Sequence, residues 1–261
     1  MWIFLGDTAP SKIFVGDTQI SKVFVGDAKV RPTWPDKDYL CFTANNAGST
    51  IKLRQYWSPT SVTLETSTDW SNWNTYTIWD TITLSNIWDK VYWRNTSTTD
   101  TWFSTYTSNR YYFEMTWSIA ASWDITSLIN KNLTLTLSDF CFVSLFTNCT
   151  SLTSSPSLPA TTLAQSCYRT MFHQCTNLVT LPQLPATTLA QSCYYNMFSN
   201  CTKIKLATSQ TWEYQTEYRI PTTWTWTTAS AALTGMFTWT WWAFKSAPSI
   251  NTTYYTSNTL V

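Results

Sequence analysis

The side chains that could carry out chemistry are few in this chain of 261 residues, and their spacing does not favour catalysis. His173 is the only histidine, which excludes two-histidine zinc sites and the His-x-x-x-His pattern of zinc proteases. No acidic residue lies between Asp139 and Glu213, so that stretch cannot supply the carboxylate pair of a glycoside hydrolase. Phosphate-loop, dinucleotide-binding and Gly-x-Ser-x-Gly motifs are absent as well. We therefore expect no catalytic residues, no cofactor and no metal.

The middle of the chain does contain carboxylates, and most of them stand beside turn-forming residues, where capping a turn is their ordinary role. A glycan-cleaving enzyme that uses two of them stays open as the weakest functional alternative. The carboxylates are Asp69, Asp80, Asp89, Asp100 and Asp124.

Six of the seven cysteines form two series with a spacing of 26 residues: Cys141, Cys167, Cys193 and Cys149, Cys175, Cys201. Equal spacing predicts a structural ladder of buried free thiols that act as small apolar core residues. Disulfides or zinc are the alternatives. The chain has no Cys-x-x-Cys, however, and its first residues do not form a secretory signal peptide, so an oxidising route is not expected. Cys41 is predicted in the core of a strand.

The same spacing governs the surrounding sequence. Residues 149–174 and 175–200 align with 17 identities, and each copy contains Leu-Pro-Ala-Thr-Thr-Leu followed by Cys-Tyr-x-x-Met-Phe. Residues 141–146 match the second half of a copy, and residues 230–237 and 244–250 match diverged parts of one. Repeats of this kind stack each apolar residue on its equivalent, so one continuous core is expected from residue 131 to residue 261.

This repeat unit resembles the leucine-rich repeats of BspA-like bacterial and phage surface proteins. The resemblance covers about half of the chain. It implies a solenoid in which each unit is a short strand and a return segment, and it implies surface exposure and adhesion.

Two further regions precede the repeats. Residues 3–12, 13–22 and 23–32 are three decapeptides with a Gly-Asp pair at the same place, which predicts narrow β-hairpins or stacked β-turns that pack on a partner chain or on the next domain. Residues 36–130 contain short β-prone runs between polar turns, which predicts an antiparallel β-sandwich or jelly roll. The expected organisation is mainly β: a decapeptide module over 1–35, a sandwich over 36–130 and a leucine-rich-repeat solenoid over 131–261.

Positions at which the two full repeats differ are candidates for a binding face, because stacked core positions should be alike. One set is expected along the strand face and one on the return segment. Unselected variation of solvent-facing residues is the alternative. The strand-face candidates are Ser155, Ser157, Leu181 and Gln183, and the return-segment candidates are Arg169 and Tyr195.

The composition contains an unusual pair of counts, 5 glycines and 17 tryptophans. The tryptophans are candidates for sugar-stacking platforms. Many of them, however, stand in turn contexts such as Ile-Trp-Asp at 78–80 and 87–89, where glycine is the usual residue. The preferred hypothesis is that most are UGA codons that the source organism reads as glycine. Trp73 and Trp93, which have strand-like neighbours, are the exceptions considered genuine.

Charge and hydropathy limit the partners. The net charge is +1 and only 12% of residues are charged, so nucleic-acid binding is not expected. No stretch approaches the roughly 18 apolar residues of a membrane helix, so no membrane insertion is expected either.

The favoured function is a non-catalytic phage virion component, in the tail or associated with a fibre. It would bind a host cell-surface protein or glycan, contact other virion proteins through the decapeptides, and form a homo-oligomer as one option. A secreted bacterial leucine-rich-repeat adhesin is the second hypothesis, with a cell-surface or extracellular location.

Overall fold

The computed structural model describes residues 38–57, 61–179, 181–204 and 229–240, together with the backbone of seven short strands outside these ranges. The chain divides into two compact units, Met1–Lys37 and Asp38–Val261. The first contains two antiparallel strand pairs, β1 (Phe14–Val15) with β2 (Thr18–Gln19) and β3 (Val23–Val25) with β4 (Ala28–Val30). Each pair falls within one predicted decapeptide.

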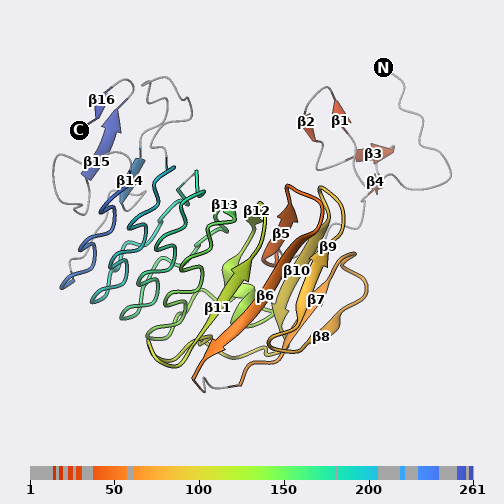
Figure 1. The fold of residues 1–261 in the computed structure, drawn as a ribbon, viewed down its shortest axis with the longest axis horizontal. Coiled ribbons are helices and arrows are strands. Elements are labelled where there is room, and N and C mark those ends of the chain that lie inside the picture. The colour runs from red at the N-terminus through yellow and green to blue at the C-terminus, as the bar shows by residue number, and fades with distance from the viewer. Residues whose placement is uncertain are drawn as a thin grey trace. The chain divides into compact units, whose positions relative to one another are not determined.

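Two sheets form the first part of the second unit (Figure 1). The larger has the order β13-β12-β5-β10-β7-β8, and the smaller has the order β11-β6-β9. Every pairing is antiparallel except that of β12 with β13. The larger sheet consists of β5 (Cys41–Ala44), β7 (Leu64–Ser67), β8 (Asn74–Tyr76), β10 (Lys90–Asn95), β12 (Ile119–Ser122) and β13 (Leu152–Ser154), and the smaller of β6 (Ser49–Tyr56), β9 (Thr81–Leu84) and β11 (Arg110–Met115).

The two sheets share a core because apolar residues alternate along their strands. In β6, Ile51 and Leu53 are fully buried, whereas the alternate residues Lys52 and Arg54 are partly exposed. Phe42 of β5 contacts Phe113 of β11 at a ring-centroid distance of 5.0 Å, and Trp93 of β10 contacts Phe113 at 5.3 Å, both edge to face. The prediction of a mainly β fold is confirmed.

Beyond the sheets the chain winds into successive coils that lie side by side in Figure 1. Backbone hydrogen bonds join residues 25 positions apart: the Phe142 N–H donates to the Cys167 carbonyl (2.8 Å) and the Tyr168 N–H to the Cys193 carbonyl (3.0 Å). The next coil follows after a longer stretch of chain, because the Tyr194 N–H donates to the carbonyl of Ala232 (2.9 Å). Residues 230–238 therefore occupy the place of a diverged copy. Turns rather than long strands make up these coils. In the turn segment of each coil every fourth residue has a positive φ, as at Ser166, Thr170 and Gln174.

Stacked rings run through the coils. Phe113, Phe146, Phe172, Phe198 and Phe237 follow one another at centroid distances of 5.3, 5.4, 5.5 and 5.6 Å, with nearly parallel planes. The first ring belongs to β11 and the others to the coils, so the core is continuous from sheet to coil. β13 also extends the larger sheet from within the repeats. The predicted division at residue 130 therefore lies inside one compact unit.

Candidate functional site

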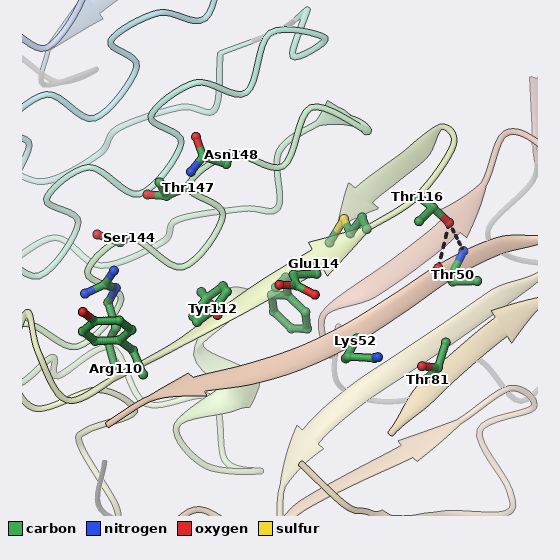
Figure 2. A pocket seen from close by; sticks show the side chains of 13 residues that line it. Thr50, Lys52, Thr81, Arg110, Tyr112, Glu114, Thr116, Ser144, Thr147 and Asn148 are labelled. Atoms are coloured by element: carbon green, nitrogen blue, oxygen red, sulfur yellow. Dashed lines mark hydrogen bonds between the residues drawn. The ribbon is translucent and has the colours of Figure 1, made fainter. Parts of the chain in front are cut away.

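A cleft of about 630 Å³ opens on the outer face of the smaller sheet, beside the first coil (Figure 2). Side chains from β6, β9 and β11 form its floor, and the turn that carries Ser144, Thr147 and Asn148 forms its edge. Strand alternation explains the floor, since Ile51 and Phe113 point to the core while their neighbours Lys52 and Glu114 point outward. The complete lining comprises Thr50, Lys52, Tyr56, Thr81, Arg110, Tyr112, Phe113, Glu114, Met115, Thr116, Ser144, Thr147 and Asn148.

Charged side chains in and beside the cleft contact one another or an aromatic ring. Glu114 accepts two hydrogen bonds from Nη1 of Arg54, at 2.6 Å to Oε1 and 2.5 Å to Oε2. Hydrogen bonding to Glu114 raises the pKa of Arg54. Lys52 stands directly opposite Glu114 in the β6–β11 register. The Arg110 guanidinium lies over the Tyr56 ring, 4.7 Å from its centroid.

These groups can recognise a polar ligand and are poorly arranged for acid–base catalysis. Hydroxyl groups, an amide, two tyrosine rings and two cations line the cleft, and the Thr50 and Thr116 hydroxyls are hydrogen-bonded at 2.7 Å. Among the residues that line the cleft, Glu114 is the only carboxylate, and it is bound to Arg54. A glycoside hydrolase needs two carboxylates facing one bond.

The return-segment candidates lie next to this cleft. The Arg169 guanidinium is 4.5 Å from the centroid of the Tyr195 ring, so two positions separated by one repeat are in contact. Thr170, which follows Arg169 in the chain, forms a hydrogen bond through its hydroxyl with the Ser144 hydroxyl (2.7 Å). The carbonyl of Thr170 accepts a hydrogen bond from Thr147 Oγ1 (2.7 Å). The edge of the cleft is thus continuous with the surface formed by Arg169 and Tyr195.

The strand-face candidates are separate from the cleft lining. Ser157 and Gln183 are exposed at equivalent positions of successive coils, whereas Ser155 and Leu181 are half-buried. Leu181 packs against the core. Ser199, which differs from its equivalent His173, is 5% exposed, so a difference between copies does not by itself mark a solvent-facing position.

The cysteine ladder lies in the core. All seven cysteines are buried and free. Cys149, Cys175 and Cys201 each donate a hydrogen bond from Sγ to the carbonyl of a ring-ladder phenylalanine, to Phe113 of β11 (3.0 Å) and to Phe146 and Phe172 one coil back (both 2.9 Å). Burial raises the pKa of every ladder thiol, to about 12 for Cys141 and Cys201 and to about 11 for Cys193. These thiols therefore combine apolar packing with a repeated weak hydrogen bond.

Two of the middle-region carboxylates, Asp69 and Asp124, accept hydrogen bonds from the backbone just after them. Asp69 accepts hydrogen bonds from the backbone N–H groups of Asn72 (2.8 Å) and Ser71 (2.9 Å), and these bonds lower the pKa of Asp69 to about 2. Asp124 accepts from the Thr126 N–H (2.8 Å) and caps the 3₁₀-helix η1 (Ile125–Leu128). Burial raises the pKa of Asp124. Both carboxylates are engaged by the backbone beside them.

Sequence reasoning did not identify the cleft, because its residues come from three strands that pair only in the folded chain. The available signal was the alternation of polar and apolar residues in 49–56 and 110–115, which marks an outward polar face without showing what lies beside it.

The described residues contain no group of three or more histidine, cysteine, aspartate or glutamate side chains that could hold a metal ion. They also contain no helix that is long and apolar enough to cross a membrane. Comparisons with protein-family models, curated proteins and solved structures found no match.

Proposed function

We propose that this protein is a non-catalytic recognition protein that binds a cell-surface glycan or protein. The observation that carries the proposal is the continuity between the polar cleft on β6, β9 and β11 and the surface of the stacked coils at Arg169 and Tyr195. Repeat proteins commonly bind partners along an extended face of this kind. Hydroxyl, amide, aromatic and paired charged groups suit a ligand that presents many hydroxyl groups.

The stacked coils support the finer proposal of a leucine-rich-repeat solenoid related to BspA-like surface proteins. The interval of 26 residues, the hydrogen bonds from one coil to the next and the parallel rings are what such an array requires. Under this proposal the protein belongs to a phage virion, in the tail or beside a fibre, and the decapeptide module contacts other virion proteins. A secreted bacterial adhesin with the same repeats is the alternative that the resemblance equally supports.

The test is binding of the purified chain to intact host cells and to an array of surface glycans. We expect Lys52→Ala and Tyr112→Ala, both in the cleft, to weaken binding tenfold or more, as roughly 1.4 kcal/mol per contact would give. Tyr106→Ala is the matched control because Tyr106 is exposed and outside the cleft lining. Equal binding by all variants would contradict the proposal.

Two further assays separate the alternatives. Release of reducing ends from host envelopes would favour a glycan hydrolase and overturn the non-catalytic assignment. An antibody to the chain distinguishes the locations: labelling of purified phage particles supports a virion component, and labelling of bacterial surfaces or culture supernatant without particles supports the adhesin.

A further inference from the structure

The tryptophans have an unusual backbone conformation. Ten of them lie in the described part of the chain, and seven of these ten have a positive φ, between 59° and 84°. The left-handed region is uncommon for any residue other than glycine, and for a bulky residue it is an outlier. The seven are Trp57, Trp70, Trp79, Trp88, Trp117, Trp123 and Trp239.

Other aromatic residues provide an internal comparison. Nineteen phenylalanines and tyrosines lie in the described ranges, and among them only Phe140 has a positive φ. The two glycines in those ranges, Gly48 and Gly235, both have one. Trp239 shares its positive φ with its coil equivalents Asn148, Gln174 and Asn200. At the other six positions tryptophan has the backbone conformation of glycine and differs from the chemically similar rings.

The turns that contain Trp79 and Trp88 favour glycine at their third position. In Thr77–Asp80 the Asp80 N–H donates to the Thr77 carbonyl (3.0 Å), and the third residue of the turn, Trp79, has φ of 84°. In Asn86–Asp89 the equivalent hydrogen bond is 3.2 Å, and Trp88 has φ of 72°. A turn with positive φ at its third position is a type II turn, which selects glycine there.

Side-chain exposure supports the same division at several positions, although Trp70 and Trp123 are half-buried. Trp57, Trp117 and Trp239 are 74%, 70% and 75% exposed, and their indoles fill no part of the core. Trp93, without a positive φ, is fully buried against Phe42, Tyr76 and Phe113, where glycine would leave a large cavity.

We infer that the natural polypeptide carries glycine at the seven left-handed positions and tryptophan at position 93. UGA codons that the source organism reads as glycine account for the substitution in the sequence as translated. The exposed indoles are then not sugar-stacking platforms, and ligand recognition depends on other surfaces. Trp70 and Trp123 now cover the Tyr92 ring at centroid distances of 4.5 and 5.5 Å, so glycine at both positions uncovers that ring on the outer face of the larger sheet.

The gene and the native protein test the inference directly. We expect UGA codons at the seven positions and UGG at Trp93. Peptide mass spectrometry of the protein isolated from its source should find glycine in peptides that cover residues 79 and 88. UGG codons with tryptophan-containing peptides would overturn the inference.

A stability measurement tests the physical argument independently of the gene. The double substitution Trp79→Gly and Trp88→Gly in a recombinant chain should raise the thermal midpoint by roughly 2–4 °C per position. Trp93→Gly is the control and should lower it. A fall in the midpoint for the double variant would contradict the claim that these turns are built for glycine.

Discussion

The cysteine ladder predicts a loss of stability at alkaline pH. Burial raises the pKa of the ladder thiols above their ordinary value of 9.0, to about 12 for Cys141 and Cys201 and about 11 for Cys193. The unfolded chain therefore releases thiol protons first as the pH rises. The stabilisation is complete below about pH 9 and is lost progressively as the pH rises toward the folded-state values.

The magnitude follows from the number of thiols. Raising the pH from about 8 to about 10 costs roughly 1–1.4 kcal/mol for each group that titrates only in the unfolded state. The pKa of Cys149, Cys167 and Cys175 is also raised by burial, so all six ladder thiols contribute. Together they remove roughly 6–8 kcal/mol, which is comparable with the entire stability of many domains.

The assay is urea unfolding under reducing conditions at pH values from about 7.5 to about 10, followed by circular dichroism. Buried tyrosines with a raised pKa add a smaller loss only near the top of this window, because the ordinary tyrosine pKa is 10.0, and Cys41, whose pKa burial also raises, adds to the loss as a seventh thiol. Cys193→Ala removes one titrating group and should reduce the slope of unfolding free energy against pH by one proton. A free energy of unfolding that stays level across the window, or thiolate absorbance that rises in the folded protein near pH 9, would refute the reasoning.

Three further predictions follow from the packing. Phe172→Ala, in the middle of the ring ladder, should lower the free energy of unfolding by roughly 3–5 kcal/mol in urea titrations, while Thr161→Ala at an exposed position of the same coil should change it little; equal effects would argue against the stack. Asp124→Ala should cost about 0.5–2 kcal/mol because η1 loses its cap, and an unchanged midpoint would show that the Thr126 N–H finds another partner. A thiol reagent at about pH 8 should leave all seven cysteines unmodified in the native protein and modify all of them in denaturant; rapid labelling of the native protein would disprove their burial.

Much of the repeat region could be predicted from the sequence because a fixed interval makes positions equivalent. An interval of 26 residues places Cys167 over Cys141, and it places Phe172 between Phe146 and Phe198. The period cannot show which surface the first coil stacks on. That surface is the edge formed by β11 and β12, where Phe113 continues the ring ladder and β13 pairs in parallel.

The sequence by itself determined the β-rich character, the ladder positions and the turns that favour glycine, because these depend on local periodicity and local backbone preference. Only the tertiary structure decided the division of the strands between two sheets, the burial of Ser199 and the position of the cleft. The physical reason is that strand pairing and side-chain burial depend on contacts between segments far apart in the chain. Alternation along a strand shows that a face is polar, whereas a neighbouring coil is needed to make that face a site.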